Sequence, residues 1–293
     1  MNAGSNDVLL GYVGLGAMGG PMATRLSDWP GGLIVYDRRA EAMTPLGAAG
    51  ARLAAGAAEV AAADVIGVAV LDDEQVREVV AGPDGIARHA APGTVIAIHS
   101  TISDSTAREL AEEFAPHGVH IIDAPVSGGP AAAAEGRLAT MVGAPRTVYE
   151  RVKPVFKQWA ALVVHAGAPG DGTRMKLARN MVTFVGFVAA CEAMTLAEHA
   201  GLDLQALGRV VRHTDGLTGG PGAIMVRDNM SEIDPGHWLY DSFTHTRDLG
   251  EKDLRLALAL GERTGTKLPL AEEALRGLAA ALGVPHPRTA EPE

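Results

Sequence analysis

The sequence has little of what several protein classes require. Its single cysteine, Cys191, rules out an intrachain disulfide and any cluster of thiolate metal ligands. The ten histidines form no H-x-x-x-H or H-E-x-x-H pair, and we predict no metal site. A G-x-S-x-G segment is also absent, which argues against an esterase. The shortage of cysteine favours a reducing compartment, and we predict a cytoplasmic protein.

Positive charge and long apolar runs are also scarce. The net charge is −10, so the chain has no broad attraction for nucleic acid or anionic lipid, although a few placed cations can still bind a small anion. The longest largely apolar stretch, residues 181–191, is much shorter than the roughly 20 residues that a membrane span needs. We predict neither nucleic acid nor membrane as a partner, and we interpret this stretch as part of a buried helix.

The first 165 residues alternate short β-rich runs with helical patterns. The strand candidates are apolar on both faces, as parallel strands covered by helices are. This alternation predicts an α/β fold with a Rossmann-type doubly wound parallel sheet. The predicted strands are residues 8–13, 33–36, 65–71, 94–99 and 119–122, with further candidates at 139–142 and 162–164, and the predicted helices are 17–27, 74–80 and 105–114.

Strand patterns stop after Gly167, and the rest of the chain has helical patterns. A long helix is predicted at residues 173–199, with Gly201 just past its end, and others at 204–213, 249–263 and 271–282. The chain is therefore predicted to have a Rossmann-type domain, residues 1–166, followed by an all-α domain, residues 167–293.

Three glycines in G-x-G-x-x-G spacing follow the first predicted strand and open a helix. In this setting the first glycine makes the turn, the second lets the backbone approach a pyrophosphate, and the third lets helix and strand pack closely. A tight turn without a ligand is the alternative. The turn predicted to bind the cofactor consists of Gly14, Leu15, Gly16, Ala17, Met18 and Gly19.

Conflicting signals follow the second predicted strand. Asp37 ends that strand and can hydrogen-bond the adenosine ribose hydroxyls, which favours NAD. Arg38 and Arg39 come next, and an arginine there can accept the 2′-phosphate of NADP. Asp37 would repel that phosphate at close range, so we predict NAD as the cofactor, with NADP as the alternative.

The segment DAPVSGG follows the strand predicted at residues 119–122. Ser127, Gly128 and Gly129 form a flexible turn with exposed N–H groups and one hydroxyl, which suits a carboxylate of a small substrate. An ordinary surface turn is the alternative, because Gly/Ser turns are common.

Four motifs occur in order along the chain: the glycine fingerprint, DAPVSGG, GxxGxGxxxKxxxN at residues 167–180, and KDL at residues 252–254. In this order and spacing the chain resembles the β-hydroxyacid dehydrogenase family, which includes 3-hydroxyisobutyrate dehydrogenase. The resemblance runs from about residue 8 to about residue 283. It implies an NAD(P)-dependent oxidoreductase that interconverts a 3-hydroxyacid and its semialdehyde. It also implies that the domain at residues 1–166 binds NAD(P), that the domain at residues 167–293 serves substrate binding and dimerisation, and that one long interdomain helix joins the two.

The resemblance also implies roles for individual residues. Lys176 is similar to the family's catalytic lysine, with Asn180 in support, and Ser127 and Gly128 would hold the substrate carboxylate. The positions implied to contact the cofactor are Leu71 and Asp72 on the adenosine side, Thr101 beside the nicotinamide ribose, and Lys252 from the second domain.

The chemistry of Lys176 and Asn180 agrees with these roles. The two are four residues apart and therefore share one helix face. An ammonium group stabilises the negative charge that forms on an aldehyde oxygen during hydride transfer, and it supplies the proton. Burial near other cations would lower the lysine pKa toward neutrality. A solvated surface lysine is the alternative, but the positive end of a helix disfavours a cation in its first turn.

Some positions depart from the family pattern. His245 stands where an aromatic residue is usual, Arg137 follows Gly136 where threonine is common, and the loop at residues 215–225 is rich in glycine. These departures leave the identity of the substrate undetermined. His245 could bond a polar substrate or be a satisfied buried histidine.

Two other functions remain possible on the same architecture. One is imine reduction, although enzymes of that kind usually carry Asp or Tyr in place of the lysine. The other is a non-catalytic binding protein, but such relatives lose the lysine and gain basic segments. 6-Phosphogluconate dehydrogenase is a more distant resemblance with a much larger α domain. The long helix is apolar nearly all round, so we predict a homodimer or homotetramer.

Overall fold

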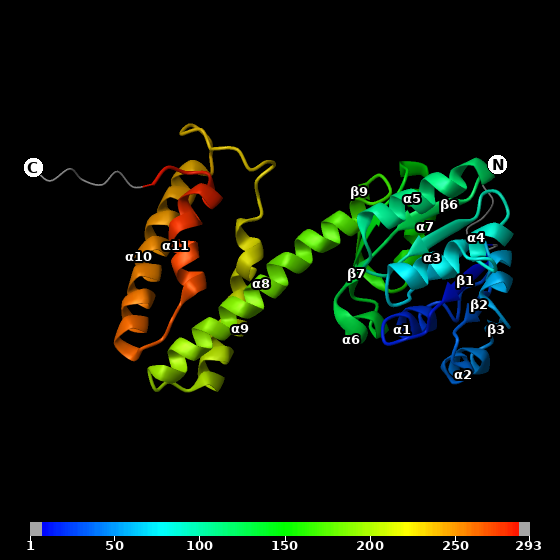
Figure 1. Cartoon of the computed structure of the whole chain (residues 1–293), viewed down its shortest axis with the longest axis horizontal. Coiled ribbons are helices and arrows are strands. Elements are labelled where there is room, and N and C mark those ends of the chain that lie inside the picture. Colours follow the sequence, from blue (N-terminus) through cyan, green and yellow to red (C-terminus); the bar gives the residue numbers. More distant parts are fainter. Residues whose placement is uncertain (1–7, 287–293) are drawn as a thin grey trace, which may run out of the picture. The chain divides into compact units, whose positions relative to one another are not determined.

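The computed structural model describes residues 8–286. It separates into two compact units, Met1–Asn180 and Met181–Glu293. The first holds a Rossmann-type sheet and the second is helical, and the long helix α8 (Asp171–His199) runs through both (Figure 1). The predicted fold class is confirmed. The domain boundary at residues 166/167 stays a prediction.

The parallel part of the sheet has a Rossmann strand order, with β1 and β4 at its centre. Its first six strands are parallel in the order β3-β2-β1-β4-β5-β6. β8 is antiparallel to both β6 and β7, and β9 lies parallel to β8, so the sheet is mixed at this edge, where the sequence predicts parallel strands. The strands are β1 (Leu10–Val13), β2 (Leu33–Tyr36), β3 (Arg52–Leu53), β4 (Val65–Val68), β5 (Val95–Ile98), β6 (His120–Asp123), β7 (Val126–Ser127), β8 (Leu138–Gly143) and β9 (Ala160–Gly167).

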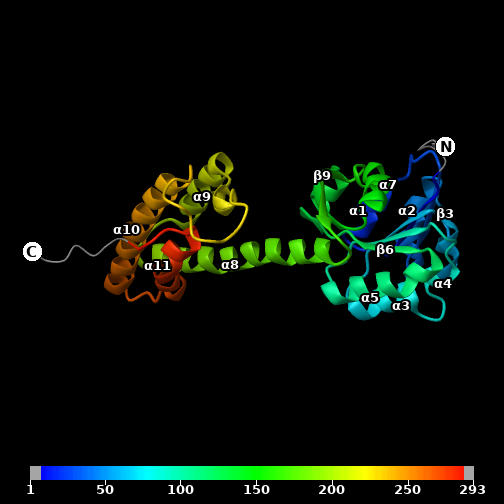
Figure 2. The same ribbon diagram turned by 90° about the horizontal axis from the view of Figure 1, so that it is seen from above.

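Helices cover both faces of this sheet (Figure 2). One buried cluster joins the strands to α1, α2 and α7, and a second joins them to α3, α4 and α5. The strands are therefore apolar on both faces, as their sequence predicts. These helices are α1 (Gly19–Thr24), α2 (Ala40–Ala48), α3 (Asp73–Ala81), α4 (Ile86–His89), α5 (Asp104–Phe114), α6 (Gly129–Ala134) and α7 (Arg146–Phe156), with the 3₁₀ segments η1 (Ala57–Ala62) and η2 (Ala115–His117).

Four of these helices were not predicted from the sequence: α2, α4, α6 and α7. The two longer ones each hold a proline inside the helix, Pro45 in α2 and Pro154 in α7. A proline there removes a backbone donor and usually breaks a helix, so local pattern alone argues against both. Packing of their apolar residues, Met43 and Leu46 in α2 and Val152 and Phe156 in α7, outweighs this cost.

The second unit contains the rest of α8 and four further segments. Within this unit α10 and α11 lie side by side (Figure 1), and a small cluster around Leu239, Phe243 and Leu282 joins them. Glu192 of α8 accepts hydrogen bonds from the Leu270 and Ala271 amides at the start of α11. These segments are α9 (Leu204–Thr218), η3 (Gly220–Ile224), α10 (Tyr240–Thr264) and α11 (Pro269–Leu282).

The apolar part of α8 is exposed in the single chain. Met181, Phe184 and Phe187 are each 60–64% exposed, so the prediction of a buried helix is wrong for one chain alone. Within residues 8–286, α8 is also the one helix that could cross a membrane by length and composition. Such a helix is weak evidence for a membrane protein, because core helices of soluble proteins pass the same test.

Candidate active site

The glycine turn between β1 and α1 is packed at two of its glycines and open at the third. Gly14 has φ +89°, and a Cβ there would lie 2.3 Å from the Ala69 carbonyl oxygen. A Cβ on Gly19 would lie 1.9 Å from the Gly14 carbonyl oxygen, whereas one on Gly16 would meet no atom within 4 Å. Gly14 and Gly19 are thus required for the turn, and Gly16 leaves room for a ligand against the backbone.

A cleft of about 1120 Å³ lies beside this turn, at the carboxyl ends of the central strands. The cleft is large enough for a dinucleotide, and the open space at Gly16 fits the approach of a pyrophosphate. Several of the predicted cofactor-binding residues line it: Gly14, Gly16, Ala17, Met18, Gly19, Asp37, Arg38, Leu71 and Asp72.

Asp37 is fixed at the edge of the cleft. Its Oδ2 accepts a hydrogen bond from the Leu15 amide at 2.6 Å, and its Oδ1 accepts one from the Arg39 amide at 2.9 Å. Burial alone would raise the pKa of Asp37, but the hydrogen bonds from Arg39 and Leu15 outweigh it and hold the pKa below its usual value. The carboxylate is therefore ionised and positioned to accept further hydrogen bonds.

Three other predicted cofactor residues lie elsewhere. Leu15 is buried beneath the turn and contributes its amide to Asp37. Thr101 follows β5 and is exposed, but it is not among the residues that line the cleft. Lys252 belongs to the second unit, where it pairs with Asp253 at 2.9 Å. Their roles toward a cofactor stay predictions.

Lys176 is buried and directed at the segment predicted to bind substrate. Its side chain is 8% exposed, and Nζ donates to the Val126 carbonyl oxygen at 2.7 Å and to Ser127 Oγ at 2.8 Å. The structure thus brings together a lysine and a serine that lie 49 residues apart in the sequence. The alternative of a solvated lysine is wrong.

Two physical causes lower the pKa of Lys176: burial of the ammonium group, and then the positive charge of Arg179. This lowering of the Lys176 pKa agrees with the prediction from the sequence. The prediction that Lys176 lies in the first turn of the helix is wrong. Because α8 begins at Asp171, Lys176 lies in the second turn, where the helix dipole has little effect.

Three further residues are predicted at the catalytic and substrate sites: Gly128, Gly129 and Asn180. Gly128 and Gly129 have φ values of +136° and +81°, which favour glycine, and they lead from β7 into α6. Asn180 is half-buried and accepts a weak hydrogen bond from Arg179. The described contacts include no hydrogen bond between Asn180 and Lys176.

Sequence analysis missed a buried carboxylate at the end of β6. Asp123 is fully buried, and it accepts hydrogen bonds from the Gly170 amide at 2.7 Å and from the Thr173 amide at 2.5 Å. Burial raises its pKa, although these hydrogen bonds oppose the shift. The signal available was an acid ending an otherwise apolar strand, which is uncommon unless the acid is paired.

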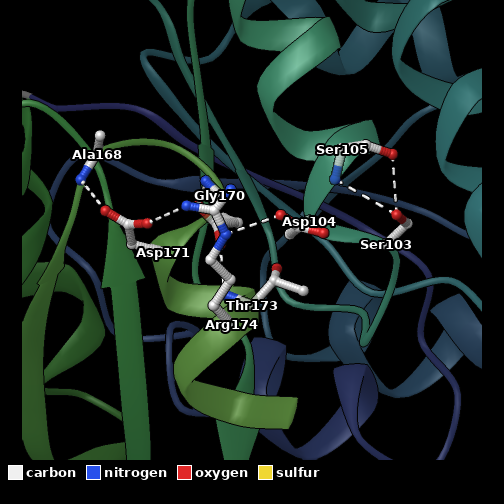
Figure 3. Close-up of polar contacts among 9 residues, drawn as sticks. Ser103, Asp104, Ser105, Ala168, Gly170, Asp171, Thr173 and Arg174 are labelled. Atoms are coloured by element: carbon white, nitrogen blue, oxygen red, sulfur yellow. Dashed lines mark hydrogen bonds and ion pairs between the residues drawn. The ribbon is translucent and has the colours of Figure 1, made fainter. Parts of the chain in front are cut away.

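The start of α8 is held by a second group of charges, shown in Figure 3. Asp171 accepts from the Ala168 amide at 2.9 Å and from Arg174, and Arg174 also binds Asp104 at the start of α5 at 2.8 Å. The first turn of α8 is thus tied to the sheet by Asp123 and to α5 by Arg174.

Two family models match most of the chain. One describes the NAD binding domain of 6-phosphogluconate dehydrogenase and matches residues 9–167. The other describes the NAD-binding domain of NADP-dependent 3-hydroxyisobutyrate dehydrogenase and matches residues 170–285. The chain belongs to the 3-hydroxyisobutyrate (β-hydroxyacid) dehydrogenase family.

Individual relatives are similar to this chain over nearly its whole length. An uncharacterized oxidoreductase of Mycobacterium tuberculosis is 58% identical over 289 residues, which cover 99% of this chain and 98% of that protein. The crystal structure of an oxidoreductase from Mycobacterium avium has a TM-score of 0.91 and 70% identity, covering 94% of this chain and 99% of that one. The NAD-dependent L-serine dehydrogenase of Pseudomonas aeruginosa is 32% identical over 275 residues, which cover 91% of this chain and 89% of that protein.

Membership of this family makes the chain an NAD(P)-dependent oxidoreductase of a group that acts on small hydroxyacids. The family consists of soluble enzymes, which argues against a membrane span for α8. His245, which departs from the family pattern, is exposed in the single chain, so its reading as a buried histidine is wrong.

Proposed function

We propose that this dehydrogenase interconverts a 3-hydroxyacid and its semialdehyde, with Lys176 as the general acid and base. The observation that carries the proposal is the contact between Lys176 Nζ and Ser127 Oγ, in a buried setting next to the DAPVSGG turn. The L-serine dehydrogenase among the relatives supports it, since L-serine is itself a carboxylate with a hydroxyl on its third carbon.

A nicotinamide cofactor, when bound, accepts or supplies the hydride. In oxidation, the neutral amine of Lys176 takes the hydroxyl proton while the carbon loses its hydride and the carbonyl forms. In reduction, the ammonium group returns that proton to the oxygen and stabilises its developing charge. The lowered pKa of Lys176 suits both directions, because it brings the two protonation states closer in energy.

Ser127 connects the proton donor to the proposed carboxylate site. Its Oγ accepts the hydrogen bond from Lys176, so its own hydroxyl proton is available for a substrate oxygen. The N–H groups of Gly128 and Gly129 supply further donors without side chains in the way. We propose that these three residues bind the substrate carboxylate and that Asn180 supports Lys176.

Turnover of a substrate panel tests this proposal. The purified protein is assayed with 3-hydroxyacids and NAD or NADP, and with semialdehydes and the reduced cofactors. Cyclic imines test the alternative of imine reduction. Reduction of an imine without turnover of any semialdehyde or 3-hydroxyacid would overturn the proposal, as would salt-sensitive DNA binding without redox activity.

We propose that NAD is the preferred cofactor and expect it to bind at least about tenfold more tightly than NADP, which corresponds to about 1.4 kcal/mol. The ionised Asp37 at the edge of the cleft can accept from ribose hydroxyls but repels a 2′-phosphate. Calorimetric titration measures both affinities. Asp37→Ser is expected to remove most of the preference, and Arg38→Ala is the matched control, which should leave NAD binding unchanged. Tighter binding of NADP by the unaltered protein would contradict this prediction.

We also propose that a second copy of the chain covers the apolar surface of α8, giving a homodimer or homotetramer. The exposed side chains of Phe184, Val185 and Phe187 form part of this surface. Sedimentation velocity at micromolar concentration is expected to show no monomer, and Val185→Glu is expected to release monomer. Leu53→Glu, at an exposed apolar position on β3, is the control and should change nothing. A monomer for the unaltered chain would refute the proposal.

A further inference from the structure

The segment 123–127 contacts α8 at two levels. At its beginning, Asp123 binds the amides of Gly170 and Thr173 at the helix start. At its end, Val126 and Ser127 bind the amine of Lys176. One short stretch of chain therefore holds both the first turn of α8 and the working atom of the proposed catalytic residue.

The first turn of α8 lies directly against backbone of the sheet. A Cβ on Gly172 would lie 2.5 Å from the Met141 carbonyl oxygen and 3.0 Å from the Asp123 carbonyl oxygen. A Cβ on Gly143 would lie 2.2 Å from Asp123 Oδ1. The carboxylate thus fills a space between β8 and the helix start, where neither neighbouring glycine can be enlarged.

Helix geometry links the two contacts. Thr173 and Lys176 are three residues apart, so they lie on one face of α8, separated along the axis by about 4.5 Å. Holding the Thr173 amide in place therefore sets the rotation of α8 about its own axis. The Lys176 side chain then points at Val126 and Ser127 rather than toward solvent.

We propose that Asp123 is a positioning residue for Lys176: its carboxylate holds the first turn of α8 so that the amine rests on Ser127. The catalytic consequence of this inference rests on the proposed function, but the placement of the amine does not. A carboxylate is needed because it accepts from two amides at once. Asparagine of the same size would offer one acceptor and present an N–H₂ group to the other amide.

The position of the amine can be measured without any substrate. The chain has only five lysines, so competitive labelling with trace acetic anhydride and peptide mass spectrometry can follow each one. Labelling of Lys176 relative to Lys153 is expected to be low in the unaltered protein. In Asp123→Asn the labelling of Lys176 should rise about tenfold. This factor corresponds to about 1.4 kcal/mol, the contribution expected from one buried hydrogen bond.

Asp171→Asn is the matched control. It removes a carboxylate from the same helix start, but one that binds Ala168 and Arg174 instead of the face that carries Lys176. Its Lys176 labelling should equal that of the unaltered protein. If Asp123→Asn does not fold, Thr173→Pro replaces it, since proline within the first turn removes the Thr173 donor without breaking the helix. This variant should show the same increase.

Kinetics provide a second readout. Asp123→Asn is expected to lower kcat by about tenfold to a hundredfold with little change in KM for the cofactor, because positioning errors act on the reaction step. The pH at which the reduction rate declines should also rise, because a released Lys176 regains water.

Unchanged labelling of Lys176 in a folded variant overturns the inference, whether or not the enzyme turns over a 3-hydroxyacid. Increased labelling of Lys176 in Asp123→Asn supports the positioning role even if the unaltered protein turns over no substrate. That absence of turnover would refute only the proposed function.

Discussion

Replacing Lys176 with alanine is expected to lower kcat by about a thousandfold, within the range of about 10² to 10⁴ that proton transfer contributes. The variant loses the proton donor and the positive charge next to the reacting oxygen. Initial rates of NAD reduction with the best 3-hydroxyacid measure the effect. Cofactor affinity should not change, because Lys176 is not among the residues that line the cleft.

Lys176→Arg is the informative companion variant. Arginine keeps the positive charge, but it cannot be deprotonated in a protein and so cannot act as a base. We expect its oxidation rate to fall nearly as far as that of Lys176→Ala. Activity near that of the unaltered enzyme would show that only charge is needed and that the acid–base role is wrong.

The dependence of rate on pH has opposite signs in the two directions. Reduction needs the ammonium form of Lys176, so its rate declines as pH rises through the lysine pKa. Oxidation needs the neutral amine, so its rate increases over the same interval. Because burial lowers this pKa, both changes should occur below the ordinary lysine value. Identical pH profiles in the two directions would contradict the assignment.

Alanine substitutions at two glycines of the turn between β1 and α1 are expected to have different large effects, one on cofactor binding and the other on stability. Gly16→Ala is expected to leave the melting temperature unchanged but to weaken cofactor binding by about a hundredfold, or about 3 kcal/mol. The space around Gly16 is open, so the new methyl group harms only a pyrophosphate that approaches the backbone.

Gly19→Ala is expected to destabilise the first unit itself, by roughly 3–5 kcal/mol, because the new Cβ would lie 1.9 Å from the Gly14 carbonyl oxygen. Thermal unfolding with and without NAD separates the two variants. Loss of stability in Gly16→Ala, or normal stability in Gly19→Ala, would contradict the assignment of these positions. Gly56→Ala is a suitable control, since its surroundings are also open and it lies outside the cleft.

The local sequence pattern was sufficient to predict elements that are defined by apolar period and capping residues. The strand at residues 33–36 and the start of the helix at Leu204 were predicted correctly, because apolar period and capping signals are short-range. Prediction failed for α2 and α7, where buried contacts outweigh a proline. It also failed for the antiparallel edge formed by β8, which depends on pairing between distant strands.

Sequence alone was enough to predict the family, the two-part architecture and the residues suited to a cofactor turn and a proton donor. Each of these depends on residue types at short, fixed spacings. Three contacts depend on the folded chain: Lys176 is buried against Ser127, Asp37 binds the Leu15 amide, and Asp123 holds the helix start. These contacts join segments 22 to 50 residues apart, and burial gives them their strength, so no local pattern could reveal them.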